Sequence, residues 1–104
     1  MDEAPPPSSE DAAPAPVQRD VVICNRRGLH ARAAARFVKL SFEFDAEVMV
    51  AKNGPAVSGR SIMGLMMLAA GPGTELQLSA TGPDAVRAID ALAALVTGGF
   101  DETQ

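Results

Sequence analysis

Tryptophan and tyrosine are absent from this chain of 104 residues, and phenylalanine, cysteine and histidine are scarce, at four, one and one. One cysteine excludes an internal disulfide, and one cysteine with one histidine cannot build a typical zinc site, so we expect neither a metal nor another cofactor. No apolar run approaches the ~18 residues that a membrane span needs, and no signal-peptide pattern opens the chain. These absences favour a cytoplasmic protein that does not insert into a membrane.

Prolines and acids are concentrated at the N-terminus. Residues 1–16 contain five of the eight prolines and four acidic residues but no lysine or arginine, which is typical of a disordered tail. The rest of the chain is neutral overall, and the hydrophobic content of 47% is enough for the core of one compact domain. We therefore expect a folded domain at 17–100 and a short C-terminal tail at 101–104.

Cations are distributed unevenly over that domain. Five of them fall in one stretch without an acid: Arg26, Arg27, Arg32, Arg36 and Lys39. A local positive field on a neutral domain indicates a small anion or an acidic protein surface as the partner. Since the chain has only four aromatic side chains that could stack on bases, we expect no nucleic-acid partner.

Hydrophobic periodicity predicts seven elements in the order βαββαβα. Alternation of apolar and polar residues marks four strands, at 18–25, 44–50, 56–58 and 74–81. Helical spacing and capping signals mark three helices, at 30–40, 62–68 and 84–97. In the helix at 30–40 we expect the buried face to consist of Ala34, Phe37 and Val38, continuing to Ser41. In the helix at 84–97 we expect it to consist of Val86, Ile89, Leu92 or Ala93, and Val96. This pattern favours an α+β fold, an open two-layer sandwich with a four-stranded antiparallel sheet and three helices on one face.

His30, the single histidine, lies where a loop enters a predicted helix, directly after Gly28 and Leu29. The first N–H groups of a helix lack partners and carry partial positive charge, so a phosphoryl group on this imidazole would meet donors for its oxygens. Arg32, two residues later, is placed to pair with the same oxygens. From these residues alone, a surface or helix-capping histidine stays an equal alternative to a phosphate-carrying one.

Two blocks resemble the HPr family, the histidine phosphocarriers of the bacterial phosphoenolpyruvate-dependent phosphotransferase system. Residues 28–34, Gly-Leu-His-Ala-Arg-Ala-Ala, resemble the family's active-site signature. Residues 61–68, Ser-Ile-Met-Gly-Leu-Met-Met-Leu, resemble its regulatory serine and the helix that follows. The spacing of the blocks and the order of the elements also agree, and the resemblance extends from residue 17 to about residue 100. One departure is Ala33, where the family usually has proline.

The resemblance implies a role for each matching residue. His30 would accept a phosphoryl group on Nδ1 from phosphorylated enzyme I and pass it to an EIIA-type domain, and Arg32 would stabilise that group. Ser61 would be the residue that an HPr kinase/phosphorylase modifies where that enzyme exists. We expect a carrier and not a self-sufficient enzyme, because the chain has no nucleotide-binding loop, metal-ligand set or substrate-cleft signature. We also expect it to be a monomer.

The helix after Ser61 is apolar around most of its circumference, although a helix packed on one sheet face cannot bury every side. We expect Leu65 and Leu68 in the core. Ile62, Met63 and Met66 are then candidates for an exposed docking patch, because methionine adapts to several partners. The resemblance implies that donor and acceptor both dock on this patch, together with Arg27.

Other interpretations remain open at this stage. Ser61 is equally well explained as a plain helix cap. Cys24 is best explained as an ordinary strand cysteine, because no base or second thiol that would make it reactive is evident. One alternative function is a regulatory binding protein whose partner choice depends on phosphorylation of Ser61. Another is a small α+β domain that binds a free anion through its arginines. The sequence also leaves open whether the carrier serves sugar uptake or the nitrogen-related branch.

Overall fold

The computed structural model describes residues 15–102, so the tail predicted at 1–16 lies almost wholly outside the described residues, as do residues 103 and 104. The strands are β1 (Val17–Val22), β2 (Glu47–Ala51), β3 (Val57–Ser58) and β4 (Glu75–Thr81). The helices are α1 (Ala31–Ser41), α2 (Ile62–Met67) and α3 (Ala85–Thr97), and a 3₁₀ turn, η1 (Gly99–Asp101), follows. The predicted order βαββαβα is confirmed. No helix within this part of the chain has both the length and the apolar character to cross a membrane.

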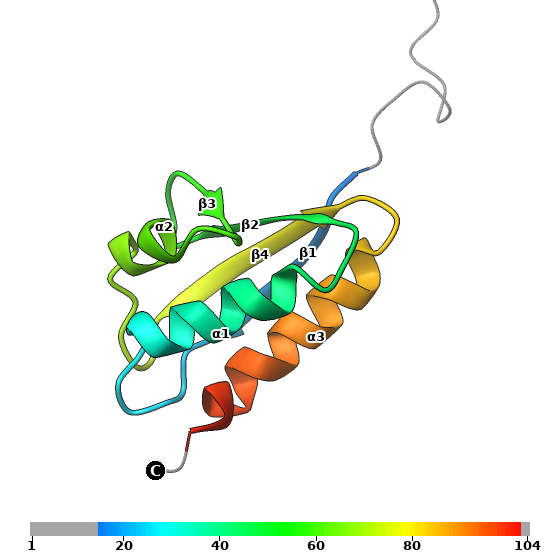
Figure 1. Ribbon diagram of the computed structural model, residues 1–104. Coiled ribbons are helices and arrows are strands. Elements are labelled where there is room, and N and C mark those ends of the chain that lie inside the picture. The colour runs from blue at the N-terminus through cyan, green and yellow to red at the C-terminus, as the bar shows by residue number, and fades with distance from the viewer. Residues whose placement is uncertain (1–14, 103–104) are drawn as a thin grey trace, which may run out of the picture.

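The four strands form one antiparallel sheet in the order β1-β4-β2-β3. β4 lies between β1 and β2, and its register pairs Leu76 with Val21 and Leu78 with Val50. Helices α1 and α3 lie side by side across one face of the sheet (Figure 1). The short helix α2 packs next to α1, on the side away from α3. The open two-layer sandwich expected from the sequence is therefore the observed architecture.

The core lies between the helices and that sheet face. In β4, Leu76, Leu78 and Ala80 are buried while the residues between them stay partly exposed, which is the alternation of a sheet covered on one face. The predicted buried face of α1 is confirmed at all four positions. In α3 the prediction fails at Val86, which is 58% exposed, because the face toward the sheet runs from Ala85 through Ala88, Ile89 and Leu92 to Val96.

Two strand boundaries differ from those predicted by more than one residue. The first strand ends at Val22 instead of residue 25, although Ile23 still exchanges hydrogen bonds with Thr74 and Gly73. The second begins at Glu47 instead of residue 44, because the preceding segment is held by Asp84. The Asp45 N–H donates to the Asp84 carboxylate at 2.9 Å, and the Asp84 N–H donates to the Asp45 carbonyl at 3.0 Å.

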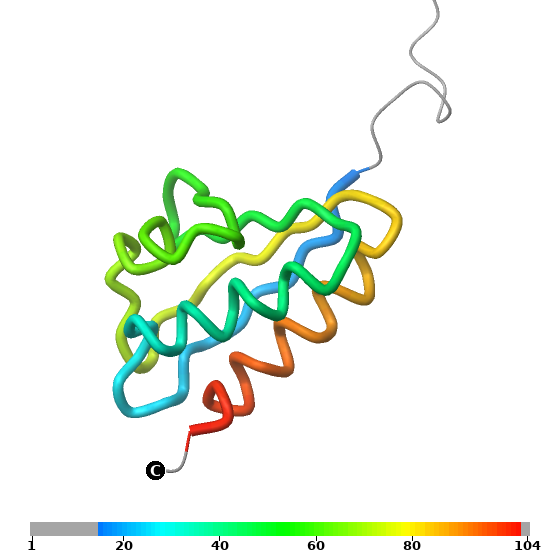
Figure 2. Tube along the Cα trace, viewed as in Figure 1, coloured from blue at the N-terminus to red at the C-terminus, as the bar shows by residue number. Residues whose placement is uncertain are grey.

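The C-terminal end returns to the loop that precedes α1. Gly98 ends α3, and η1 then buries Phe100 completely. In Figure 2 this last turn, in red, lies next to the cyan loop between β1 and α1. Residues separated by about 70 positions in the sequence thus meet at the start of α1.

Candidate functional site

The loop before α1 is clamped to the segment that follows α2. Gly28 has a positive φ of 68°, and a Cβ atom at this position would lie 2.6 Å from the Ala70 carbonyl oxygen. The next residue, Leu29, donates its N–H to that same oxygen at 2.9 Å. Only glycine allows both the left-handed backbone and this close approach. Gly28 therefore sets where His30 enters the helix.

Substituting Gly28→Ala should lower the free energy of unfolding by about 1–3 kcal/mol from the left-handed backbone alone. The clash with the Ala70 carbonyl should add to that loss, because a backbone atom cannot move aside cheaply. Urea denaturation measures the effect. Gly73→Ala is the matched control, since Gly73 also has a positive φ, of 85°, but a Cβ there meets nothing within 4 Å. Equal losses in the two variants would contradict a role for the close approach.

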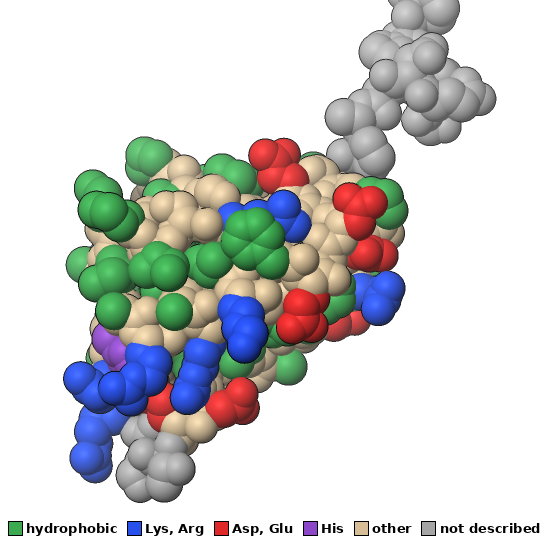
Figure 3. Space-filling model, viewed as in Figure 1, with side chains coloured by type: hydrophobic (Ala, Val, Ile, Leu, Met, Phe, Trp, Pro, Cys, Tyr) green, Lys and Arg blue, Asp and Glu red, His purple; other side chains and the backbone are tan. Residues whose placement is uncertain are grey.

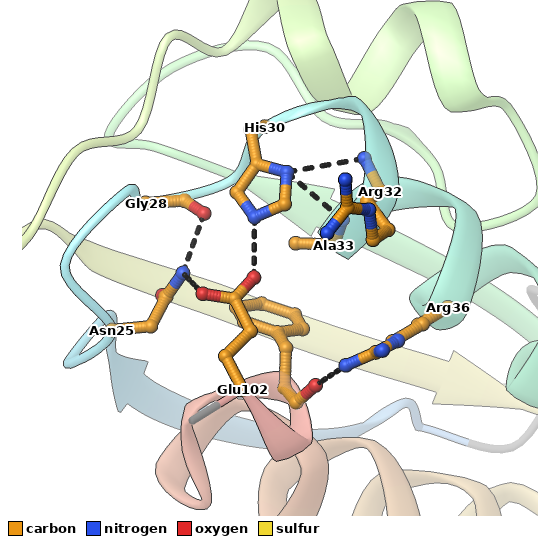
Figure 4. Close-up of polar contacts among 8 residues, drawn as sticks. Asn25, Gly28, His30, Arg32, Ala33, Arg36 and Glu102 are labelled. Atoms are coloured by element: carbon orange, nitrogen blue, oxygen red, sulfur yellow. Dashed lines mark hydrogen bonds and ion pairs between the residues drawn. The ribbon is translucent and has the colours of Figure 1, made fainter. Parts of the chain in front are cut away.

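His30 is the N-cap residue of α1, with φ −78° and ψ 179°. Its Nδ1 accepts hydrogen bonds from the backbone N–H groups of Arg32, at 3.2 Å, and Ala33, at 3.5 Å (Figure 4). Both distances are long, so these bonds are weak. A proline at position 33 could not donate, so the Ala33 that departs from the family pattern adds a donor at the helix start. Nδ1 thus faces the first amides of α1, which lie where the oxygens of a phosphoryl group on Nδ1 would be.

The other ring nitrogen, Nε2, contacts the Glu102 carboxylate at Oε2 (Figure 4). The second carboxylate oxygen accepts a hydrogen bond from Asn25 Nδ2 at 3.1 Å, and the same amide group donates to the Gly28 carbonyl at 2.8 Å. The side chains of His30 and Glu102 are only 18% and 14% exposed. Asn25 is buried, and its Oδ1 has no hydrogen-bond partner among residues 15–102.

Hydrogen bonds from His30 and then Asn25 hold the pKa of the Glu102 carboxyl below its ordinary value of 4.5, with the nearby positive charge of Arg36 acting in the same direction. The carboxylate is therefore ionised at neutral pH and can only accept hydrogen bonds. Backbone N–H groups can only donate. Together these contacts assign the ring proton to Nε2 and a free lone pair to Nδ1.

Glu102 was missed by the sequence analysis, which placed it in the tail expected at 101–104. Its position is fixed by Phe100, whose ring fills the core and whose carbonyl oxygen accepts a hydrogen bond from the Arg36 guanidinium. The available signal was the Gly98-Gly99-Phe100 sequence, in which a large apolar residue follows a helix stop. A phenylalanine is more often buried than exposed, and the burial of Phe100 brings the next residues back against the domain.

Three of the five clustered cations meet beside the histidine. Arg27, Arg32 and Arg36 line a shallow hollow of about 340 Å³ together with Asp101 and Glu102. In Figure 3, Lys and Arg side chains, in blue, gather below the purple histidine. Lys39 lies farther along α1 and lines a neighbouring hollow, which shares Arg36 and Asp101 with the first. The two acids oppose the three guanidinium groups, which argues against a dedicated site for a free anion.

Helix α2 exposes most of its apolar side chains. Ser61 is its N-cap, as predicted, and its Oγ accepts a hydrogen bond from the Gly64 N–H at 2.9 Å. The exposed fractions are 40% for Ile62, 74% for Met63, 43% for Met66 and 79% for Met67; these four form what we call the α2 patch. Leu65 is fully buried, and Leu68 packs partly buried against the core. Met67 was not singled out from the sequence, although its exposure is the largest of the four.

The α2 patch and the histidine belong to one side of the molecule. Figure 3 shows hydrophobic side chains directly above the histidine and cations directly below it. Phe42, which is 61% exposed, adds another apolar group next to the Arg60 guanidinium, 4.7 Å from the ring centre. An apolar area beside a positive one, with a partly exposed imidazole between them, suits contact with a protein whose surface is apolar and acidic.

Comparisons with known proteins agree with this geometry. Residues 17–98 match the family model described as the PTS HPr component phosphorylation site. Phosphocarrier protein HPr of Cupriavidus necator is 48% identical over 86 residues, which are 83% of this chain and 97% of that protein. Phosphocarrier protein NPr of Shewanella violacea is 45% identical, over 83% of this chain and 94% of that protein. A crystal structure of HPr from Bacillus anthracis superposes with a TM-score of 0.76 and 42% identity, over 80% of this chain and 99% of that one. The chain belongs to the HPr family of phosphocarriers of the phosphotransferase system.

Proposed function

We propose that His30 accepts a phosphoryl group on Nδ1 from phosphorylated enzyme I and transfers it to an EIIA-type protein. The observation that carries this proposal is the orientation of Nδ1. Its lone pair faces the first N–H groups of α1 while the ring proton is on Nε2. A nucleophilic nitrogen with donors for phosphate oxygens beside it has what phosphoryl transfer requires, which is positioning and charge stabilisation.

The transfer needs little rearrangement of this site. The Nδ1 lone pair attacks the phosphorus of a phosphohistidine on the donor, and the Nδ1–P bond forms as the donor's N–P bond breaks. The electron pair of that broken bond returns to the donor's ring nitrogen. The two weak hydrogen bonds to Nδ1 are given up, and the N–H groups of Arg32 and Ala33 become free to donate to the phosphate oxygens.

Docking would use both parts of the surface around His30. The α2 patch offers flexible methionine side chains to an apolar area of either partner. Arg27 and Arg32, both exposed, offer charge to acidic groups and to the phosphoryl group itself. We propose that a monomer performs this cycle in the cytoplasm. Relatives named HPr and NPr match about equally well, so both branches remain candidates.

Incubation with enzyme I and phosphoenolpyruvate tests the proposal. We expect one phosphate per chain that is labile to acid and stable to base, with an Nδ1–P signal in ³¹P NMR. Acid-stable phosphate alone would point to Ser61 and to a regulatory binding protein. Tight binding of inorganic phosphate without covalent labelling would favour an anion-binding domain.

Ser61 supports a second, regulatory proposal. Its hydroxyl lies at the start of α2, next to Ile62 and Met63 in the α2 patch. A phosphate on this hydroxyl would put about two negative charges at the edge of the apolar docking surface. We propose that phosphorylation of Ser61 by an HPr kinase/phosphorylase, where one is present, reduces the rate at which His30 is phosphorylated.

Substituting Ser61→Asp should reduce phosphorylation of His30 by enzyme I about tenfold, because a carboxylate that loses water against an apolar surface costs about 1–3 kcal/mol without a partner. Folding should be unharmed, since aspartate is a good N-cap and suits the positive helix start. Steady-state kinetics with enzyme I measure the effect. Ser61→Asn is the matched control, because it caps the helix equally well without a charge. Equal rates for the Asp and Asn variants would show that Ser61 is only a cap.

A further inference from the structure

We propose that Glu102 is a positioning residue for phosphoryl transfer, which holds the His30 ring by its Nε2–H so that Nδ1 presents its lone pair to the donor. This inference rests on the proposed function of His30 and extends it to a residue outside both sequence motifs. The observations are the contact of Nε2 with Glu102 Oε2, the anchoring of Oε1 by Asn25, and the low exposure of both side chains.

The capping hydrogen bonds alone are insufficient to fix the ring. At 3.2 and 3.5 Å they are weak, both act on Nδ1, and both are lost when Nδ1 becomes the nucleophile. The Glu102 contact lies on the opposite nitrogen and is not used in bond formation. It can therefore persist through the transfer and keep the ring plane, the tautomer and the direction of the lone pair constant.

Glu102 is itself held from three sides. Asn25 Nδ2 bridges the Glu102 carboxylate to the Gly28 carbonyl, which ties the carboxylate to the backbone of the histidine loop. Phe100, two residues earlier, is fully buried, and Arg36 of α1 donates to its carbonyl oxygen. Figure 4 shows this arrangement, with Glu102 between Asn25 and the carbonyl that Arg36 contacts. A carboxylate held in this way can fix the orientation of an imidazole, as carboxylates that accept from the free N–H of a metal-binding histidine do.

Charge also favours this role. When the Nδ1–P bond forms and the donor's N–P bond breaks, Nε2 keeps its proton, so the phosphorylated ring carries a positive charge. The ionised carboxylate at Nε2 stabilises that charge from the side opposite to the phosphate. The negative phosphate meets the amides of α1 and the guanidinium groups of Arg27 and Arg32, so the two anions remain separated by the ring.

The test compares the full-length wild-type protein with Glu102→Gln and, as the matched control, Glu47→Gln. The control makes the same chemical change at an exposed carboxylate of β2 that neither lines the hollow beside His30 nor contacts the ring. Two quantities are measured: the Nε2–H proton resonance of His30 in the unphosphorylated protein, and the rate of phosphorylation by enzyme I with phosphoenolpyruvate.

For wild type and Glu47→Gln we expect a slowly exchanging Nε2–H resonance and equal rates. For Glu102→Gln we expect that resonance to move upfield and exchange faster, because a neutral amide oxygen accepts a weaker hydrogen bond than a carboxylate. We also expect a rate lower by about tenfold, the lower end of the cost of removing a residue that orients a functional histidine. An unchanged resonance or an unchanged rate in Glu102→Gln overturns the inference, as does an equal change in Glu47→Gln. Because the resonance is read without any partner, it tests the role of Glu102 even if enzyme I does not phosphorylate the wild type, a result that would count against the proposed function instead.

Discussion

Replacing His30 with alanine should abolish acid-labile phosphorylation by enzyme I, with no residual signal above background. No other histidine is present in the chain, so no second imidazole can take over. Folding should weaken only modestly, because alanine at an N-cap costs about 0.5–2 kcal/mol. Among residues 15–102, the contact with Glu102 is the only hydrogen bond that the ring makes beyond its two capping bonds. Labelling from phosphoenolpyruvate, with acid and base quenching, gives the result.

His30→Asn separates the two effects of that substitution. Asparagine is a good N-cap, so this variant should recover most of the stability while remaining without phosphate. Acid-labile phosphate on either variant would contradict the proposed function. Loss of phosphate only in the variant that is also unfolded would indicate that His30 acts through the structure of α1, not as the acceptor.

Local patterns were sufficient to predict the fold. Alternation in residues 74–81 identified the central strand, and helical spacing identified the buried face of α1, because each follows from one periodicity and one covered sheet face. The errors arose where long-range contacts decide the outcome. Residues 44–46 alternate like a strand, but the backbone of Asp45 is hydrogen-bonded to Asp84, 39 positions away. Val86 has helical spacing, yet the packing of α3 turns it outward.

The candidate site divides in the same way. His30, Arg32 and Ser61 lie at helix starts, which leave clear local signals, so the sequence could place them. Asn25 and Glu102 carry no such signal. Their meeting with His30 depends on the burial of Phe100 and on a contact that joins positions 30 and 102. No periodicity encodes a contact of this range, although the final apolar residue of the domain indicated that the chain returns to the core.

Arg32 is the cation with the largest expected effect on the chemistry. Its backbone N–H donates to Nδ1, and its side chain, which is exposed, lines the hollow beside the ring. A guanidinium offers two parallel donors that match phosphate oxygens. In the unphosphorylated protein the Arg32 side chain makes no hydrogen bond or ion pair with another residue between 15 and 102, so its removal should hardly affect stability.

Arg32→Ala should therefore slow phosphoryl transfer to and from His30 by about 10²–10³-fold, the usual cost of losing a donor to developing charge. Transfer should not vanish, because the backbone N–H groups of residues 32 and 33 remain. Rapid-quench kinetics with enzyme I measure it, and Lys39→Ala is the matched control, since it removes a cation from the same helix that does not line the hollow beside His30. Arg32→Lys keeps the charge but loses the paired donors, so it should fall between wild type and Arg32→Ala. If Arg32→Ala and Lys39→Ala slow the transfer equally, the general positive field acts and not a specific contact. If neither slows it, Arg32 is a surface cation and the helix amides alone hold the phosphoryl group.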